Sequence, residues 1–465
     1  MRAGARRVRF ALLVISVAVL SGYLVQAQIR FSLPLFAHLR GDASLSLECG
    51  EEDVLLVVAP HCDDEVFGAG GFLYEAAKKK AKVYVVVVTN GDAFRLLLRR
   101  PSWALDLGIR RQRETLEALE VLGIPKDHVF FLGYPDQGLE PLFHEHWSPD
   151  VPYLSRFTGR EFTPAASFRP GSPYCGVNVA FDLEEILRAV RPTIVLTSSP
   201  FDTHPDHRAA YNFTMYALER LRYEDPFFEN TRVFWYLVHW NLWPHGSMTG
   251  AGVKLVPPRE LCVPTIRWRY YFLSKDAIFA KTRAVRKYRS QSTGGYPLSF
   301  VRANELFVEA RRVKIPTLTE SITVDGVEED WKGPSVSLAF PEVRVRRNGG
   351  RNSLSLTLAK DEEYLYLFLG SLPRERAVYR FHFLPVVPFS GKEVALDVSS
   401  EDGAWRTVTI PNEKGKITSY AFGREGLEVA VPLHLLHHAP TVFFKMEVLD
   451  RGRVVAESIW RILTF

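Results

Sequence analysis

The sequence predicts two folded domains, an α/β domain with a mostly parallel sheet followed by an all-β sandwich. From Asp53 onwards, short apolar runs alternate with segments of helical length, which is the pattern of a parallel sheet with helices on both faces. Beyond about residue 316, helical periodicity stops and only alternating runs remain, which favours strands. A chain of 465 residues is also too long for one typical domain.

Composition and charge exclude some classes of function. The net charge of +5 is mild for this length, and no basic block interleaved with aromatic residues argues for nucleic-acid binding. With 47% hydrophobic residues the chain can bury sizeable cores. The cysteines show no CxxC spacing, so they predict neither a disulfide framework nor a zinc ribbon. They lie at positions 49, 62, 175 and 262.

The first thirty residues predict export from the cytoplasm. Residues 1–9 contain four arginines, and Phe10–Val25 is apolar apart from two serines and a glycine. A positive segment before an apolar one is typical of a secretory signal peptide or of a single amino-terminal membrane anchor. Both interpretations place the bulk of the chain outside the cytoplasm, secreted or anchored. Residues 31–50 are expected to be a linker.

Residues 51–315 predict a Rossmann-like domain, in which strand and helix alternate. Its expected strands lie at 53–59, 83–88, 129–133, 193–197 and 233–240. The first expected helix ends near residue 80, and the second spans 109–122. Two more expected helices begin near 181 and near 207. A last, basic helix closes with KYRSQS at 287–292. A loop-rich insertion at about 140–176 lies beside the strand ends, so we expect it to form a rim of the substrate pocket.

Residues 316–465 form the predicted second domain. Alternating apolar and polar residues at 322–331, 354–370 and 441–450 predict strands separated by charged turns. No helical period of any length interrupts them, which favours a β-sandwich.

A group of polar side chains follows the first expected strand. The apolar run DVLLVVA ends at Pro60, and HCDDE at 61–65 follows at once. Open α/β sheets place their sites at the carboxyl ends of buried strands. Because adjacent side chains diverge, one carboxylate of Asp63 and Asp64 could bind a metal with His61 while the other faces the reacting water. The alternative is that His61 caps the next helix and that the two aspartates only begin it.

A second polar cluster repeats this layout. In TIVLTSSPFDTHPDH, at 193–207, a buried strand precedes His204, Asp206 and His207 at the start of another helix. Two strand ends that carry His and Asp could converge on one ion and leave a fourth position open, which is how catalytic zinc is usually held. Nitrogen and oxygen ligands also admit other divalent ions.

Five ordered motifs resemble the PIG-L/LmbE family of zinc-dependent N-deacetylases. They are HCDDE at 61–65, TNGD at 89–92, RRQRETLEALEVLG at 110–123, LGYPDQGL at 132–139 and HPDH at 204–207. The resemblance covers about residues 50–300, and KYRSQS is similar to the stretch that often ends this family's catalytic domain. Cys62 stands where the family has Pro. We interpret it as tolerated, because the flanking positions are retained, although a thiol could compete as a zinc ligand.

The resemblance implies a role for each residue of the first motif. It implies that His61 and Asp64 bind Zn²⁺ together with His207, which leaves an open position on the ion. Asp63 is then free to accept a proton from the reacting water and to pass it to the departing amine. We expect Glu65 to begin the helix or to support the site from outside the ligand set.

The resemblance also implies residues nearer to the substrate. His204 is implied to stabilise the oxyanion, while Asp206 either orients His204 and keeps it protonated or only caps the helix. Polar contacts to sugar hydroxyls are implied for Asp92, Arg111 and Asp136. Arg111 is also compatible with an ordinary arginine on a helix surface, because Arg110 and Arg113 flank it.

The second domain resembles DOMON-like and family-nine-type carbohydrate-binding modules. The resemblance is carried by DGVEEDW at 325–331 and DEEYLY at 361–366. Because both motifs are short, a sandwich that only packs on the enzyme domain is an equal alternative.

Together these features predict a zinc-dependent N-deacetylase, a hydrolase that cuts the acetamide of an N-acetylglucosamine-type sugar or glycoconjugate. Its expected partner is an acetylated amino sugar or glycan. One alternative is hydrolysis of another small amide, such as a thiol-sugar conjugate. A non-catalytic glycan-binding protein is the alternative from a different class, and the intact cluster of His and Asp residues argues against it.

Overall fold

The computed structural model describes most of the chain after the amino-terminal region. The described residues are 47–93, 101–244, 252–291, 296–331, 333–347, 350–370, 377–387, 393–401, 404–408, 419–422 and 425–465. The predicted signal peptide or anchor, and most of the linker after it, lie outside this part. Among the helices that the structure describes, none is both long and apolar enough to cross a membrane.

The first domain is built on a seven-stranded sheet with the strand order β3-β2-β1-β4-β5-β7-β6. Its strands are β1 (Val54–Ala59), β2 (Lys82–Thr89), β3 (Val129–Tyr134), β4 (Ile194–Ser198), β5 (Arg232–Tyr236), β6 (Trp268–Phe272) and β7 (Asn304–Glu309). The first five strands pair in parallel, so the predicted mostly parallel sheet is confirmed. The pairs β5–β7 and β6–β7 are antiparallel, and the sequence analysis did not predict β6 and β7.

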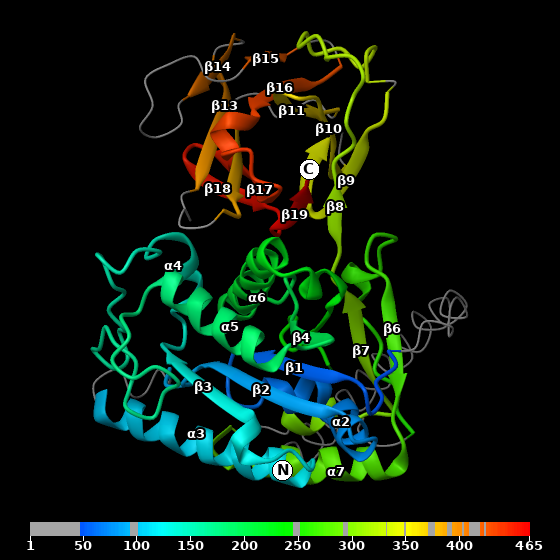
Figure 1. Ribbon diagram of the computed structural model, residues 1–465. Coiled ribbons are helices and arrows are strands. Elements are labelled where there is room, and N and C mark those ends of the chain that lie inside the picture. The colour runs from blue at the N-terminus through cyan, green and yellow to red at the C-terminus, as the bar shows by residue number, and fades with distance from the viewer. Residues whose placement is uncertain are drawn as a thin grey trace, which may run out of the picture. The chain divides into compact units, whose positions relative to one another are not determined.

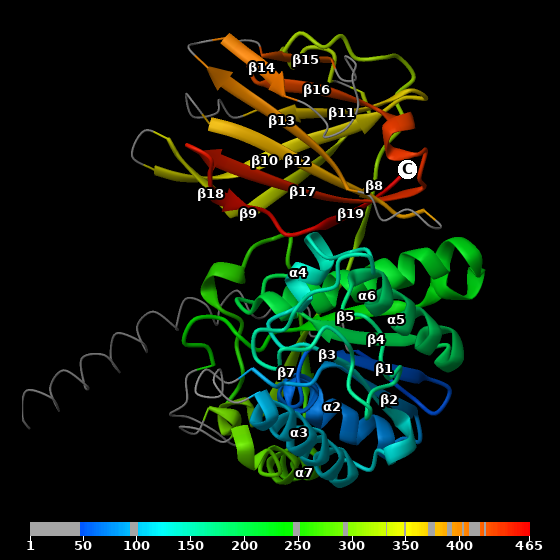
Figure 2. The same ribbon diagram turned by 90° about the vertical axis from the view of Figure 1, so that its left-hand side faces the viewer.

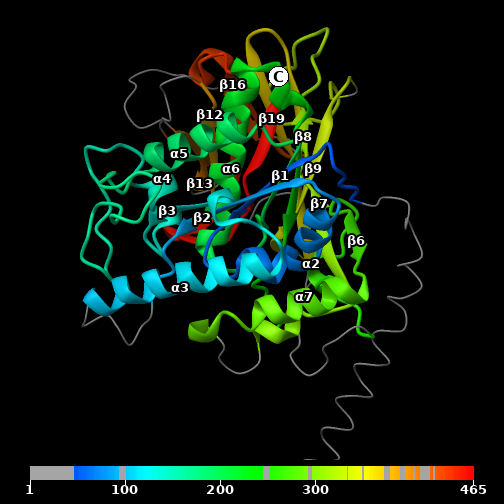
Figure 3. The ribbon, with the colours of Figure 1, turned by 60° about the horizontal axis from the view of Figure 1, so that its bottom comes forward.

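Helices cover both faces of this sheet (Figures 1 and 3). On one face lie α2 (Asp64–Lys78), α3 (Pro101–Val121) and α7 (Lys275–Val285). On the other face lie α4 (Leu139–His144), α5 (Gly176–Val190) and α6 (Pro205–Glu224). The described 3-10 helices of this domain are η2 (Lys126–His128), η3 (Pro226–Asn230), η4 (Arg259–Leu261), η5 (Arg289–Gln291) and η6 (Pro297–Phe300). A further 3-10 helix, η7 (Leu433–Leu436), follows β16 in the second domain.

Helix α3 begins at Pro101, eight residues before the expected start at 109. Proline suits the first turn of a helix because its fixed φ is already helical and its missing N–H has no partner there. The added turns carry Trp103, which is 50% exposed. This apolar side chain therefore does not follow the buried stripe on which the sequence prediction relied.

The strand order reverses between β1 and β4. The chain leaves β1 towards β2 and β3 on one side and returns to β4 and β5 on the other. In doubly wound sheets a ligand binds at the carboxyl ends of the strands where this reversal occurs, because the two connecting segments diverge there. The HCDDE loop follows β1 and the HPDH segment follows β4, so both predicted clusters lie at this reversal point.

The second domain consists of two β-sheets around a shared core (Figure 2). One sheet has the order β15-β16-β11-β10-β9, and the other has the order β14-β13-β12-β17-β19-β8, with β18 paired to β17. The strands are β8 (Arg312–Lys314), β9 (Val336–Arg347), β10 (Gly350–Lys360), β11 (Tyr364–Leu369), β12 (Ala377–Pro385), β13 (Val394–Glu401), β14 (Ala404–Val408), β15 (Ser419–Phe422), β16 (Leu427–Pro432), β17 (Thr441–Asp450), β18 (Arg453–Glu457) and β19 (Arg461–Thr464). The predicted β domain is confirmed. The predicted domain boundary at 315/316 stays a prediction. Strand β8 precedes this boundary in the sequence, yet it pairs with β19 in a sheet of the second domain.

The prediction of a strand at 322–331 is wrong, because this segment is an irregular loop that ends in a turn. The backbone N–H groups of Asp325 and Gly326 donate to the carboxylate of Glu428 at 2.9 and 2.7 Å, and Trp331 Nε1 donates to its other oxygen. The ring of Trp331 packs against Phe368 on the outer face of the sheet. The apolar residues of this motif therefore cover the sheet instead of extending it.

A buried ion pair joins three elements of the first domain. Lys281 in α7 donates to Glu305 Oε1 of β7 at 2.7 Å and to the carbonyl of Phe67 in α2 at 2.8 Å. The Glu305 carboxylate also accepts from the backbone N–H groups of Gly71 and Phe72. Because Lys281 and Glu305 are both at most 1% exposed, removal of one partner leaves a buried group without compensation.

Replacing Lys281 with methionine is expected to lower the free energy of unfolding by about 3–5 kcal/mol. Lys78→Met is the matched control, because Lys78 of α2 pairs with Asp276 of α7 at 3.1 Å. Lys281 also links α7 to α2, through the carbonyl of Phe67. These two side chains are 61% and 68% exposed, so water screens their attraction and the control variant should lose much less stability. Urea denaturation followed by circular dichroism measures both losses. Equal losses in the two variants would contradict the prediction.

Candidate metal centre

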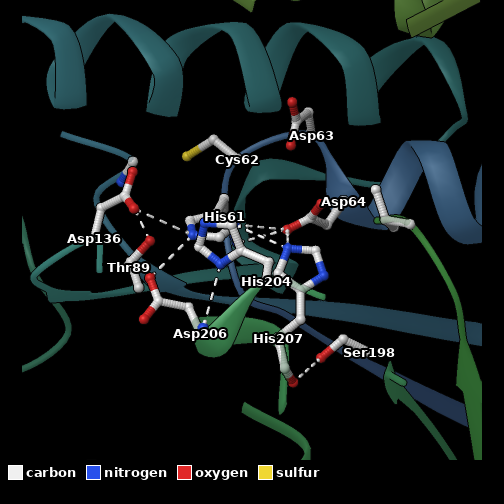
Figure 4. A network of polar contacts seen from close by, with 12 residues as sticks. His61, Cys62, Asp63, Asp64, Thr89, Asp136, Ser198, His204, Asp206 and His207 are labelled. Atoms are coloured by element: carbon white, nitrogen blue, oxygen red, sulfur yellow. Dashed lines mark hydrogen bonds and ion pairs between the residues drawn. The ribbon is translucent and has the colours of Figure 1, made fainter. Parts of the chain in front are cut away.

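The two predicted clusters meet at the carboxyl ends of β1 and β4 (Figure 4). His61 follows β1, and Asp64 opens α2. His204 caps α6 at its first turn, and His207 lies one turn further on. Segments more than a hundred residues apart in the sequence thus bring three histidines together, with the His61 ring 4.7 Å from the His204 ring and 5.1 Å from the His207 ring.

Three atoms form a triangle that fits a metal ion. His61 Nδ1, Asp64 Oδ2 and His207 Nε2 lie 3.1 Å from one another along each side. Zinc bonds of about 2.0–2.1 Å place tetrahedral ligand atoms roughly 3.3–3.4 Å apart, so a small outward movement of these atoms accommodates the ion. Two imidazoles and one carboxylate are a donor set that zinc accepts. The expected ligands are therefore brought together in a suitable geometry.

In both His61 and His207, the ring nitrogen that does not belong to the triangle lies beside a buried carboxylate. His61 Nε2 lies 3.2 Å from Asp206 Oδ2 and 3.4 Å from Asp136 Oδ1. His207 Nδ1 lies 3.1 Å from Asp202 Oδ2. A carboxylate on the second ring nitrogen fixes the tautomer and orientation that a metal-binding histidine needs. The sequence analysis did not select Asp202, although its position in the PFDTHPDH segment could have indicated it.

Opposite charges shift the pKa of every residue in the triangle. Burial alone would lower the pKa of His207, but the carboxylates of Asp202 and Asp64 raise it to about 10. Burial also opposes the charge on Asp64, yet His207 and His61 hold the pKa of this carboxyl well below its usual range. In the absence of a cation the imidazoles therefore retain protons, which metal binding must displace.

Asp63 and Asp64 diverge, as the sequence predicted (Figure 4). Asp64 faces His207, whereas Asp63 lines the adjacent cavity. Burial, followed by the charge of Asp64, raises the pKa of Asp63 well above its ordinary value. A carboxylate beside the ion that is not needed as a ligand is available to accept and return a proton.

The carboxylate of Asp206 does not bind the ring of His204. It accepts from the backbone N–H groups of Gln137 and Leu139 and contacts His61. Instead, the backbone N–H of Asp206 donates to His204 Nδ1 at 3.3 Å. Burial and the neighbouring imidazoles of His61 and His207 lower the pKa of His204 to about 2. His204 is therefore a neutral imidazole that can donate from Nε2, and the expectation that Asp206 keeps it protonated is not met.

The predicted substrate contacts fall into two groups. Asp136 and Arg111 line the cavity, and Arg111 Nη1 lies 3.8 Å from Asp136 Oδ2. Asp92 is fully buried, and one of its oxygens accepts from the backbone N–H of Asp136 at 3.2 Å. Asp92 thus differs from the expectation of direct contact, because its carboxylate lies behind Asp136 and supports that residue.

The cavity beside the triangle has a volume of about 1040 Å³. Its described walls include residues of the HCDDE and HPDH loops, of α3 and of η5, together with Tyr296. Asp136 and Gln137 from the loop after β3, and His239 after β5, also line it. The insertion at 140–176 was expected to form a rim, but none of the described lining residues comes from it. Helix α3 takes this place because it extends further towards the site than the sequence indicated.

His239 is a further histidine at the site that the sequence analysis missed. Its ring lies 4.8 Å from that of His207, and Tyr296 OH approaches its Nδ1 at 3.3 Å. It follows β5, and its backbone N–H donates to Asp202 Oδ2 at 2.9 Å. The sequence analysis placed His239 inside the expected strand at 233–240, whereas β5 ends at Tyr236.

Cys62 is fully buried, and burial raises the pKa of its thiol above the ordinary range. A thiol must lose its proton to bind zinc. Within the described part of the chain, the groups of side chains able to hold a metal include histidines and aspartates but no cysteine.

Comparisons with known proteins find a matching family model and similar curated proteins. The family model described as PIG-L: GlcNAc-PI de-N-acetylase matches residues 56–218. A 1D-myo-inositol 2-acetamido-2-deoxy-alpha-D-glucopyranoside deacetylase from Mycobacterium sp. (strain KMS) is 30% identical over 187 residues, which are 37% of this chain and 53% of the relative. The corresponding deacetylase 2 from Saccharopolyspora erythraea is 30% identical over 252 residues, which are 51% of this chain and 82% of the relative.

The chain spans about half the length of most curated relatives that it matches. Among solved structures, it is similar to the N,N'-diacetylchitobiose deacetylase from Pyrococcus horikoshii with a TM-score of 0.34 and 19% identity, over 57% of this chain and 80% of that chain.

Proposed function

Because the chain belongs to the PIG-L (GlcNAc-PI de-N-acetylase) family, we propose that it is a zinc-dependent hydrolase that removes the N-acetyl group from an N-acetylglucosamine-type sugar or glycoconjugate. The observation that carries this proposal is the triangle of His61 Nδ1, Asp64 Oδ2 and His207 Nε2, with sides of 3.1 Å. Asp63 and His204 line the cavity beside it. His61 from the ligand set, the proton acceptor Asp63 and the hydrogen-bond donor His204 therefore line one cavity.

Each residue has a definable part in cleaving the amide. Zinc bound by the triangle would lower the pKa of water and polarise the acetyl carbonyl. Asp63 takes a proton from the attacking water and delivers it to the leaving nitrogen as the C–N bond breaks. The neutral ring of His204 donates a hydrogen bond to the oxygen that becomes negative as water adds. The products are acetate and a free amine.

The cavity wall supports a sugar as the amine component. Asp136 and Arg111 offer an acceptor and donors beside the proposed reaction centre, and sugar hydroxyls require both. The curated relatives named above act on a glucosamine-type acetamide joined to inositol. A volume of about 1040 Å³ has room for more than one sugar ring.

Two further parts of the proposal concern the rest of the chain. We infer that it works outside the cytoplasm, secreted or anchored, because residues 1–30 have the pattern of a signal peptide or anchor. We also propose that the β domain binds glycans, on the support of its resemblance to carbohydrate-binding modules. The ring of Trp331 is buried, so this ring does not offer a stacking surface for a sugar.

Acetate release tests the proposed activity. The zinc-loaded protein is expected to release acetate from N-acetylglucosamine, its oligomers or its inositol conjugate, and a chelator is expected to abolish this release until zinc is restored, because the ion supplies the polarisation. A thiol-sugar conjugate in the same panel tests the alternative amide. Glycan binding without acetate from any of these substrates would contradict the proposal and favour a binding protein.

A further inference from the structure

The backbone of Asp63 has an unusual conformation. Its φ is 142° and its ψ is −27°, a region that residues with a side chain rarely adopt. Such a conformation persists only where the surrounding structure holds it, and it is found often at functional sites. Contacts close to Asp63 must therefore hold the conformation that aims its carboxylate into the cavity.

These contacts come from Glu65 of α2 and from the KYRSQS segment, which lies more than two hundred residues further along the chain. Gln291 Nε2 donates to the carbonyl of Cys62, the residue before Asp63, at 2.6 Å. The Asp63 N–H donates to Glu65 Oε2 at 3.0 Å, and the hydroxyl of Tyr288 donates to the other oxygen of Glu65. Both sides of the Cys62–Asp63 peptide are thus tied to one segment.

The segment is itself fixed to α3. The backbone N–H and the hydroxyl of Ser290 donate to the Glu114 carboxylate at 3.0 and 2.6 Å. Tyr288 is fully buried and packs edge-on against Phe67 of α2. The hydrogen bonds to the Cys62–Glu65 loop therefore start from anchored groups, so they can resist movement of the loop.

We propose that Tyr288 and Gln291 are positioning residues that hold Asp63 in the conformation required for proton transfer. This inference rests on the proposed function, in which Asp63 accepts a proton. The KYRSQS segment acts on Asp63 through the carbonyl of Cys62 and through Glu65. It contributes no group that reacts.

The metal ligands are held by other contacts. Asp202 orients His207, and Asp206 and Asp136 orient His61. Loss of the contacts from Tyr288 or Gln291 should therefore displace Asp63 and leave the ion in place. This difference separates positioning of the proton acceptor from general support of the metal centre.

The variants Gln291→Met and Tyr288→Phe remove these hydrogen bonds with little change in volume. We expect kcat to fall about 10- to 100-fold, the usual effect of losing an outer partner of a site, with KM almost unchanged and one zinc retained. Lys287→Met is the matched control, because Lys287 lies in the same segment but faces Glu117, 3.6 Å away, and not the loop. It should retain the kcat of the wild type.

Hydrogen–deuterium exchange provides a readout that does not need turnover. In the zinc-loaded protein, the amide of Asp63 should exchange faster in Tyr288→Phe and Gln291→Met than in the wild type or Lys287→Met, because its local opening becomes easier. Unchanged exchange and unchanged kcat would overturn the inference, and so would a fall in kcat explained by loss of zinc. A wild type that releases no acetate but shows the exchange difference would contradict only the proposed function.

Discussion

Replacing Asp63 with asparagine is expected to lower kcat about 100- to 10,000-fold, the range typical of lost general acid–base catalysis, while zinc binding and folding persist. Asparagine keeps the shape of the side chain, but its amide cannot accept the proton from water. The ligand triangle does not include Asp63, because the two adjacent carboxylates diverge and only Asp64 lies 3.1 Å from the nitrogens of both His61 and His207.

Acetate release and metal content, measured on the same preparation, test this prediction. Asp127→Asn is a suitable control, since Asp127 is an exposed residue of η2 outside the cavity. An Asp63→Asn protein that retains zinc and turns over at the wild-type rate would show that another group takes the proton. Loss of zinc from this variant would instead place Asp63 among the ligands.

The sheet could be predicted because its central strands are buried on both faces. In β1, every residue after Val54 is buried, so an uninterrupted apolar run was a sufficient signal. The edge strand β6 gave no such signal, because Trp268–Phe272 is only partly buried and mixes charged with aromatic residues. The alternation of Ile322 and Val324 was misleading, since these side chains cover the outer face of a sheet.

The resemblance to the deacetylase family implied the ligand set, and the structure brings the implied atoms of His61, Asp64 and His207 together. Adjacent aspartates must diverge, and residues three apart on a helix start can face one space. The partners of these ligands depend on tertiary contacts. Asp206 faces His61 and not His204, because the latter lies at the helix cap with its Nδ1 turned towards the backbone N–H of Asp206. No spacing rule indicates this arrangement.

His239 is a second candidate ligand beside the triangle. One oxygen of Asp64 and a ring nitrogen of each of His207 and His239 lie within 4.8 Å of one another, so His239 is a possible competitor for the ion. The triangle with His61 is tighter, with sides of 3.1 Å. In addition, Asp202 binds the His207 ring, whereas it binds only the backbone N–H of His239. A ring held by a carboxylate is oriented for a metal.

His207→Ala is therefore expected to weaken zinc binding by more than about 100-fold, because loss of even an outer partner costs 10- to 100-fold, and to abolish acetate release. His239→Ala is the matched comparison and should retain one zinc per chain. Titration with a competing zinc chelator measures both affinities, and circular dichroism shows whether each variant is folded. If His239→Ala lost zinc while His207→Ala kept it, the triangle with His61 could not be the metal site. Since imidazole protons must leave before the ion binds, the wild-type affinity should also rise with pH, and this dependence should become weaker in His207→Ala.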